Sequence, residues 1–415
     1  MRGFKEMKIL VINCGSSTIK FQVIAVAGKG GDLRGQHRVA RGLIDRLGRG
    51  ASCAFSAANG MSLHEEAPIR SHEDGVRRIM DWLDRIAASA GADGRRLDAV
   101  GHRVVHGGDE FAAPVRLDEA VIAKIDALSE LAPLHNPPAV SGIRAARKIL
   151  GPAIPMVAVF DTSFHHTMPK EAATYAISHD LATRYGIRRY GFHGLAHEYS
   201  MLRYGELTGR SPQETKVITL HLGNGCSATA ICNGESVDTS MGFTPLEGLV
   251  MGTRSGDVDP ALVSYLARQE RVDAAEVEEW LNKRSGLLGL SGVTNDMREL
   301  IATMNESPRS RLAVDIFCYR ARKYFGAYLA VLGGAQALIF SGGIGENAPL
   351  VRQKICAGME WCGLKLDAAL NGALIGRDGE ISTADSKLKA YVIHTDEEAI
   401  IARATLALLG DKSMA

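Results

Sequence analysis

The chain has 415 residues, of which 46% are hydrophobic and 23% are charged, and its formal net charge at pH 7 is +1. These values are ordinary for a globular protein long enough for two domains, and they give no indication of a nucleic-acid partner. We find no apolar run of about 18 residues, so we expect no membrane span.

The seven cysteines are scattered, without a CxxC pair, which indicates free thiols and a cytoplasmic location. The N-terminal sequence MRGFKEMKILVIN lacks the apolar region and cleavage site of a signal peptide. Its apolar residues from Ile9 to Ile12 indicate a first strand instead. Either Met1 or Met7 fits as the first residue, and the sequence leaves that choice open.

Two segments resemble one another. Residues 8–26 form a predicted strand, a turn rich in Gly and Ser, and an alternating strand, and residues 217–232 repeat that order around Gly223-Asn224-Gly225. Because the two predicted hairpins lie about half the chain apart, duplication with one hairpin per domain is favoured over two unrelated hairpins.

Strands and helices alternate through the rest of the chain, as expected of an α/β protein. We expect the last helix, 397–409, to be amphipathic and to pack across the interdomain region. The other predicted elements are helices at 76–86, 117–128, 139–150, 308–332 and 351–359, strands at 99–105, 155–160 and 337–340, and a rigid proline loop at 133–138.

Residues 238–260 have no sustained helical or strand period, yet they are too apolar for disorder. Four glycines and two prolines bend the segment and let backbone approach a ligand closely. Arg254 is the only cation in it. We therefore predict an ordered active-site wall that presents one arginine.

A second arginine, Arg103, lies in a predicted strand among valines, and a buried arginine requires an anion. Two arginines in one site suit a small carboxylate and a phosphoryl group. His193 and His197 have HxxxH spacing, but no Glu follows the first, which argues against a zinc protease.

Glycine-rich turns give the sequence its candidate phosphate sites. The turn after Asn13 offers backbone N–H groups together with Ser and Thr hydroxyls. Residues 342–347, GGIGEN, follow a predicted strand and precede a helix, which places N–H groups at a helix N-terminus. They do not match the dinucleotide pattern GxGxxG.

Eight motifs run in one order from residue 13 to residue 403, in addition to the segment 238–260. The chain thereby resembles the acetokinase family of acetate and propionate kinases. The motifs are NCGSSTIKFQ, GHRVVHGG, LHNPP, VFDTSFHHTMP, RYGFHG, HLGNG, GGIGEN and TDEEAIIAR.

The resemblance implies the duplicated α/β fold of actin, sugar kinases and heat-shock ATPases, with the active site in the cleft between two lobes. Its lobes would be residues 1–161 with 398–415, the C-terminal helix packing back, and a nucleotide-binding lobe of residues 162–397. Periodicity alone predicts only two α/β domains. The resemblance also implies a homodimer.

The resemblance implies a role for each matched residue. Arg103, Asp161, His193 and Arg254 would be catalytic, and Asn13 and Glu397 would hold Mg²⁺, for which Mn²⁺ can substitute. Arg103, Val105, Leu134, Phe192 and Pro245 would form the acyl pocket. The ATP site would comprise Lys20, His221, Leu222, Gly223, Asn224, Gly225, Asp296, Met297, Arg298, Gly343, Ile344, Gly345, Glu346 and Asn347.

The expected reaction is the reversible Mg²⁺- and ATP-dependent phosphorylation of acetate to acetyl phosphate, by direct in-line transfer. A carboxylate acceptor is already anionic at pH 7, so it needs positive charge and alignment rather than a base. A propionate or short-chain acyl kinase is the alternative. An ATP-driven conformational switch is a remote one, and a sugar kinase, which needs an Asp base, is disfavoured by the two arginines.

Asp396 departs from the family pattern, in which Asn precedes the glutamate that corresponds to Glu397. The other departures, such as Thr18, His166 and Ala139, remove no expected catalytic residue. Because Asp396 adds negative charge beside an expected metal ligand, we hypothesise that it alters the affinity for Mg²⁺.

Overall fold

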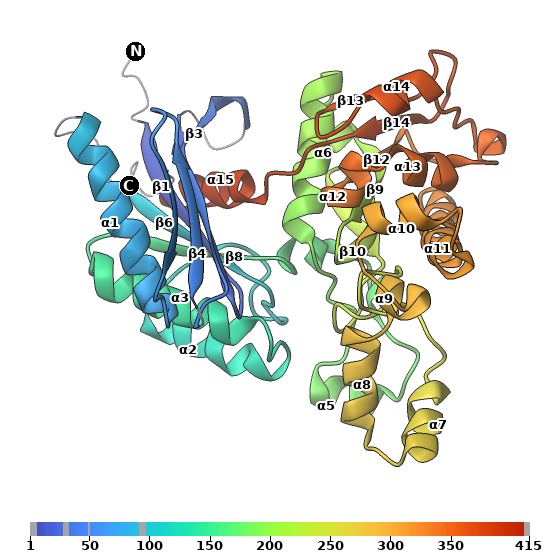
Figure 1. Ribbon diagram of the computed structural model, residues 1–415, viewed down its shortest axis with the longest axis horizontal. Helices are drawn as coiled ribbons and strands as arrows, with labels where there is room; N and C mark the ends of the chain where they lie inside the picture. The colour runs from blue at the N-terminus through green and yellow to red at the C-terminus, as the bar shows by residue number, and fades with distance from the viewer. Residues whose placement is uncertain (1–5, 28–32, 49, 91–96, 411–415) are drawn as a thin grey trace. The chain divides into compact units, whose positions relative to one another are not determined.

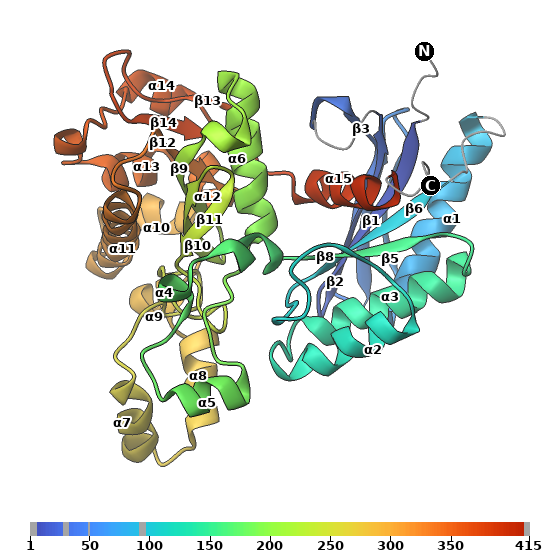
Figure 2. The ribbon, with the colours of Figure 1, turned by 180° about the vertical axis from the view of Figure 1, so that it is seen from behind.

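The computed structural model describes residues 6–27, 33–48, 50–90 and 97–410. Met1 lies outside these ranges, so the structure does not bear on whether Met1 or Met7 is the first residue. The chain divides into two compact units, residues 1–163 with 396–415, and residues 164–395. Each unit is a mixed sheet flanked by helices (Figures 1 and 2). All seven cysteines are free thiols, and no helix among the described residues is long and apolar enough to cross a membrane.

The first unit is built on a sheet with the strand order β5-β4-β3-β2-β1-β6-β8-β7. Strands β1 and β2 form the first predicted hairpin, while β1, β6 and β8 run parallel. The strands are β1 (Met7–Cys14), β2 (Thr18–Val26), β3 (Gln36–Asp45), β4 (Ala51–Ala57), β5 (Ser62–Ala67), β6 (Ala99–Val104), β7 (Val115–Arg116) and β8 (Met156–Phe160).

Strand alternation gives this sheet two covered faces. Leu10 and Ile12 belong to a core formed with helices α1 (His72–Ala90) and α3 (Asn136–Leu150), which α2 (Glu119–Ala127) adjoins. Helix α15 (Glu397–Gly410) lies along β1, β2, β6 and β8 on the other face (Figures 1 and 2). The closing helix of the chain thus completes the first unit.

The second unit repeats this topology. Its strand order is β11-β10-β9-β12-β14-β13, and β9, β12 and β14 are parallel while β10 and β11 are antiparallel neighbours. The five strands β11-β10-β9-β12-β14 have the same relative directions, and follow one another along the chain in the same way, as β3-β2-β1-β6-β8 of the first sheet. This match confirms the duplicated α/β fold. The strands are β9 (Lys216–Leu222), β10 (Cys226–Cys232), β11 (Glu235–Thr239), β12 (Ala337–Ser341), β13 (Gly379–Glu380) and β14 (Lys389–Val392).

Helices flank the second sheet on both faces, with α6 along β9 and β12 and α11 along β9 and β10 (Figures 1 and 2). Helix α11 starts as predicted, because the Ser307 hydroxyl accepts a hydrogen bond from the N–H of Ser310. The helices are α4 (Lys170–Ala173), α5 (His179–Tyr185), α6 (Gly194–Thr208), α7 (Ala261–Glu270), α8 (Ala274–Lys283), α9 (Gly286–Ser291), α10 (Met297–Thr303), α11 (Pro308–Leu332), α12 (Gly342–Asn347), α13 (Pro349–Cys356) and α14 (Ala368–Ala373).

Three element predictions were wrong in detail. The proline loop predicted at 133–138 is shorter than expected, because the prolines at 137 and 138 belong to the first turn of α3. A missing N–H costs no helical hydrogen bond at that position. The helix predicted through Met359 ends at Cys356, so α13 is shorter. Helix α15 is less amphipathic than predicted, since residues 399–402 are all buried. Its packing across the interdomain region stays a prediction.

We expect Gly101→Ala to destabilise the first unit. A Cβ atom at Gly101 in β6 would lie 2.6 Å from Cγ2 of Ile401 and 2.7 Å from Oγ1 of Thr405, so α15 would have to move. Such overpacking costs about 1–3 kcal/mol of unfolding free energy. Gly326→Ala in α11 is the matched control, because nothing lies within 4 Å of its added methyl. The control should gain about 0.5–1 kcal/mol. Equal urea midpoints for both variants would contradict the close packing of α15.

Candidate active site

Arg103 and Asp161 lie together at the carboxyl ends of β6 and β8 in the first unit. Arg103 Nε donates to Asp161 Oδ1 at 2.8 Å, and Nη2 donates to Oδ2 at 2.6 Å. Residues two apart on β6 share a face, so Arg103 lies on the face of Gly101, which α15 covers. Arg103 and Asp161 form a bidentate ion pair in which Asp161 is buried and Arg103 is partly buried.

Glu397 is the first residue of α15, and its Oε2 lies 3.6 Å from Nη1 of Arg103. Burial disfavours the charged guanidinium, but the attraction of Asp161 and Glu397 outweighs it and raises the pKa of Arg103. Burial raises the pKa of Asp161, and its two hydrogen bonds from Arg103 oppose that rise. The charge of Arg103 is therefore already matched within its own unit.

Three successive carboxylates, Asp396, Glu397 and Glu398, crowd the start of α15. Burial, followed by repulsion from Glu397 and Asp396, raises the pKa of Glu398 to about 7. Asp396 Oδ1 accepts the N–H of Ala399, which makes Asp396 the N-cap of the helix. Its Oδ2 lies 2.9 Å from Nη2 of Arg38. Asp396 thus caps a helix and pairs with a cation, two roles that its sequence position did not reveal.

These carboxylates bear on the expected metal site. Within the described ranges, no group of three or more His, Cys, Asp or Glu side chains is arranged to hold a metal ion. Mg²⁺ commonly takes only one or two protein ligands, with waters and substrate phosphates completing its octahedron. Asn13 is the next-to-last residue of β1, the strand that lies between β2 and β6. Repulsion from Glu397 and Asp396 adds to burial in raising the pKa of Glu398, and a bound cation would relieve that repulsion, so the carboxylates at the start of α15 fit Mg²⁺.

His193, a predicted catalytic residue, lies in the second unit at the N-cap of α6. Its backbone is left-handed, with φ 58°, a strained conformation for a histidine and one that functional sites often retain. Its Nδ1 lies 2.9 Å from Oγ of Ser227 on β10. A Cβ atom on Gly225 would lie 3.2 Å from His193 Nε2. The ring is therefore held beside the turn of the second hairpin.

Arg254 lies in the irregular segment, since no helix or strand is assigned from Ser240 to Pro260. The N–H groups at the start of α9 bind this segment, with Leu287 donating to the carbonyl of Met251 and Leu288 to that of Gly252. Asp257 accepts hydrogen bonds from the N–H of Gly248 and the hydroxyl of Tyr324. The segment is thus anchored along its length and, as predicted, is ordered.

The guanidinium of Arg254 is partly buried and is held by a carbonyl rather than a carboxylate. Its Nη1 donates to the carbonyl of Pro245 at 3.1 Å, and the same atom would lie 3.6 Å from a Cβ atom on Gly225. Burial lowers the pKa of Arg254. In the described part of the chain no Asp or Glu forms an ion pair with it. The geometry brings Arg254 and His193 together beside one hairpin turn, as an anion site requires.

Three predicted nucleotide segments meet around a cavity of about 510 Å³ in the second unit. The segments are the turn of the second hairpin, the start of α10 and helix α12. Asn295 and Ala348 also line the cavity; neither was predicted, although each adjoins a predicted segment. The predicted residues that line it are Gly223, Asn224, Asp296, Met297, Arg298, Gly343, Ile344 and Asn347.

Glycine is required where this cavity is built. A Cβ atom on Gly252 would lie 2.0 Å from Oδ1 of Asn224. The N–H of Gly252 donates to the carbonyl of Asn224, and Asn295 Nδ2 donates to Oδ1 of Asn224 at 3.0 Å. The glycine-rich segment therefore fixes Asn224 through close backbone approach.

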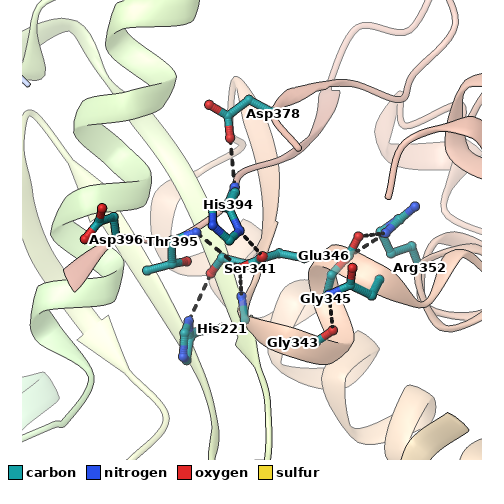
Figure 3. A network of polar contacts seen from close by, with 12 residues as sticks. His221, Ser341, Gly343, Gly345, Glu346, Arg352, Asp378, His394, Thr395 and Asp396 are labelled. Carbon is teal, nitrogen blue, oxygen red and sulfur yellow. Dashed lines mark hydrogen bonds and ion pairs between the residues drawn. The ribbon is translucent and has the colours of Figure 1, made fainter. Parts of the chain in front are cut away.

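Glu346 was predicted to bind nucleotide, but its side chain is buried and turned toward the protein (Figure 3). Its Oε1 accepts the N–H groups of Gly342 at 3.0 Å and Thr395 at 3.1 Å, and its Oε2 lies 2.6 Å from Nδ1 of His394. Buried Arg352 donates to the carbonyls of Gly345 and Glu346 (Figure 3). Glu346 thus ties α12 to the end of the second unit, and its carboxylate does not line the cavity.

Comparison with known proteins decides the family. The acetokinase family profile matches residues 8–403, and the acetate kinase of Chloroherpeton thalassium is 49% identical over 411 residues, covering 96% of this chain and 98% of that protein. The chain belongs to the acetokinase family.

Two solved members of the acetokinase family share the whole fold. The crystal structure of Porphyromonas gingivalis acetate kinase superposes with a TM-score of 0.88 at 41% identity, covering 97% of this chain and 100% of that one. A propionate kinase from Francisella tularensis superposes with a TM-score of 0.86 at 37% identity, covering 96% and 98%.

The acetokinase residues expected to form the acyl pocket are divided between the units. Val105 and Leu134 lie in the first unit, while Phe192 and Pro245 lie in the second. Lys20 is likewise in the first unit, where it attracts the carboxylate of Glu398. The acyl pocket and the role of Lys20 toward ATP therefore stay predictions, as do the roles of His221, Leu222, Gly225 and Gly345.

We expect Asp396→Asn to change how stability depends on pH. Glu398 keeps its proton to about pH 7 in the folded protein, whereas an unfolded glutamate loses it near about pH 4.3. The folded state binds more protons between these values, so stability should fall as pH rises through that window. Asparagine keeps the helix cap but removes one repelling charge, which should lower the pKa of Glu398 and reduce the fall.

The measurement is the Tm of both proteins between pH 5 and pH 8 in the presence of EDTA. Parallel Tm curves would contradict the coupling between Asp396 and Glu398. Repeating the series with Mg²⁺ tests the hypothesis that Asp396 alters metal affinity, which would be abandoned if Mg²⁺ shifted both proteins equally.

Proposed function

We propose that this protein catalyses the reversible transfer of the γ-phosphoryl group of ATP to acetate, giving acetyl phosphate and ADP. Membership of the acetokinase family and the 49% identity to an acetate kinase support the substrate. The observation that supports the chemistry most directly is the arrangement of Arg254 and His193 beside the turn at Gly225. A cation held by a carbonyl, without a carboxylate partner in the described ranges, has its charge available for a bound anion.

Electrostatic repulsion is the main obstacle to this reaction. Acetate is ionised at pH 7, so no group has to remove a proton from it. The acceptor must instead approach a phosphate chain of like charge, in line with the bond that breaks. Arg254 would neutralise the charge spread over the transferring phosphoryl oxygens, and His193 would donate a hydrogen bond to them. Transfer would be direct, without a covalent enzyme intermediate.

Arg103 would have a different part from Arg254. Its Nε and Nη2 are occupied by Asp161, which leaves the Nη1 edge, on the side of Glu397, for a substrate oxygen. We assign Arg103 to orientation of the acetate carboxylate, with Val105, Leu134, Phe192 and Pro245 as the acyl pocket. Asp161 would hold Arg103 in position and keep this part of the site from carrying excess positive charge.

Asn13 and Glu397 would hold Mg²⁺, directly or through its waters, with the crowded carboxylates at the start of α15 favouring a cation there. A bound Mg²⁺ supplies charge neutralisation to the phosphate oxygens of ATP. The cavity bounded by Asn224, Met297 and Ile344 would take the adenosine, since about 510 Å³ lies within the range of small-molecule sites. The homodimer and the cytoplasmic location belong to the same proposal.

Arg254→Ala should lower kcat by about 10²–10³-fold, as removal of a charge-stabilising donor commonly does. Binding of ADP should change far less, because the adenosine cavity has other walls. Turnover can be followed by trapping acetyl phosphate with hydroxylamine, and ADP affinity by calorimetry. Arg268→Ala is the control, since Arg268 is an exposed arginine in the last turn of α7 and does not line the cavity. Near-normal turnover of Arg254→Ala would refute the role of Arg254.

The alternative is a propionate or short-chain acyl kinase, in view of the similarity to the Francisella propionate kinase. One methylene group changes a specificity constant by only about 10–200-fold. We expect kcat/KM for acetate to exceed those for propionate and butyrate when all three are measured with the same enzyme. A larger value for propionate would reassign the substrate and leave the phosphoryl-transfer chemistry intact.

A further inference from the structure

A chain of hydrogen bonds runs from His193 into the interior of the second unit. His193 Nδ1 lies 2.9 Å from Oγ of Ser227, and the same oxygen lies 2.7 Å from Nε2 of His197. His197 Nδ1 lies 2.7 Å from Oγ1 of Thr219. The hydroxyl of Thr219 donates to the carbonyl of Thr229 at 3.4 Å. Ser227, His197 and Thr219 are completely buried.

Two periodicities build this chain. His193 and His197 are four residues apart, so they lie on one face of α6. Thr219 on β9 pairs with Thr229 on β10, and Ser227 pairs with His221, so these side chains share one face of the sheet. The helix face meets the strand face, and each imidazole is joined to a hydroxyl.

The number of hydroxyl and imidazole protons limits which way the hydrogen bonds of this chain can point. Ser227 has one proton but contacts two imidazole nitrogens, so it can donate to only one of them. Burial, reinforced by His165 and His221, lowers the pKa of His197 well below its ordinary value, so His197 is neutral and has a single N–H. Thr219 has one proton and directs it to the carbonyl of Thr229.

Only one order keeps the hydrogen bond from the Thr219 hydroxyl to the carbonyl of Thr229. Thr219 accepts from His197 Nδ1–H, which leaves His197 Nε2 to accept from the Ser227 hydroxyl. Ser227 then accepts from His193 Nδ1–H. In neutral His193 the proton is therefore at Nδ1, and Nε2 has a lone pair.

We propose that Ser227, His197 and Thr219 hold His193 in its Nδ1–H tautomer, so that His193 can donate to the phosphoryl group only as an imidazolium. The role of His193 toward phosphoryl rests on the proposed function, whereas the tautomer rests on the hydrogen-bond chain. A neutral ring would turn its Nε2 lone pair toward the phosphoryl oxygens and repel them. Ser227, His197 and Thr219 are thus positioning residues.

Charged and titratable groups surround His193 on each packed element. Arg254, from the irregular segment, approaches the same Gly225 turn, and its charge opposes protonation of the ring. The ring of His221 on β9 lies 5.0 Å away, and His197 follows on α6. The negative phosphates of ATP favour the imidazolium. Protonation of His193 is therefore expected to accompany substrate binding.

NMR of the enzyme labelled with ¹⁵N-histidine tests the tautomer directly, above the pH at which His193 titrates. Two-bond ¹⁵N–¹H correlations should show Nδ1–H for His193 in the wild type. Thr219→Val removes the far acceptor at nearly constant volume, so His197 should change to Nε2–H and Ser227 should then donate to His193. The expected result is Nε2–H at His193, although the side chains of His197 and Ser227 separate His193 from the substituted residue. Nε2–H in the wild type would overturn the proposal.

Two further variants complete the experiment. Ser227→Ala should also release His193 to Nε2–H, and loss of its fold would leave Thr219→Val as the deciding variant. Ser341→Ala removes the hydroxyl that lies 3.2 Å from His221 Nδ1. It should leave the tautomer of His193 unchanged, and a change there would show that the readout is not specific to the chain.

Activity provides a second readout. In the wild type kcat/KM should fall about tenfold for each pH unit above the pKa of His193, and this fall should flatten in Thr219→Val. Equal pH profiles with the expected tautomers would overturn the requirement for imidazolium. Turnover of His193→Ala separates this inference from the proposed function, because near-normal activity would remove His193 from catalysis whatever its tautomer.

Discussion

The ion pair between partly buried Arg103 and buried Asp161 is the interaction on which the polar cluster of the first unit depends. Two hydrogen bonds of 2.8 and 2.6 Å join the ends of β6 and β8, and Glu397 at the start of α15 approaches the same guanidinium. A buried charge without a partner is strongly destabilising, so each member of this group requires the others. The register of the two strands and the position of α15 are thereby tied to one electrostatic arrangement.

Arg254 shows the opposite solution to the same constraint. The carbonyl of Pro245 holds its guanidinium, and glycines at 225, 252 and 286 let the surrounding backbone segments approach closely. Partial neutralisation by dipoles leaves a net positive charge, where a carboxylate would have cancelled it.

Sequence patterns predicted the two hairpins, their duplication and the ordered segment around Arg254, because periodicity and glycine placement are local signals. They did not predict which way a side chain turns. Glu346 lies in a nucleotide motif, yet its carboxylate is occupied by Gly342, His394 and Thr395. Asp396 appeared as added charge, and only the fold reveals the cap on α15 and the pairing with Arg38. Such orientations depend on partners distant in sequence.

Duplication explains why polar residues recur at the carboxyl ends of parallel strands in both units, where open α/β sheets usually bind ligands. The side-chain chemistry at these strand ends nevertheless differs between the units. Carboxylates gather beside Arg103 in the first unit, where they suit a cation, whereas imidazoles, hydroxyls and Arg254 gather in the second, where they suit phosphate. One ancestral topology can thus carry side chains suited to a cation in one unit and side chains suited to an anion in the other.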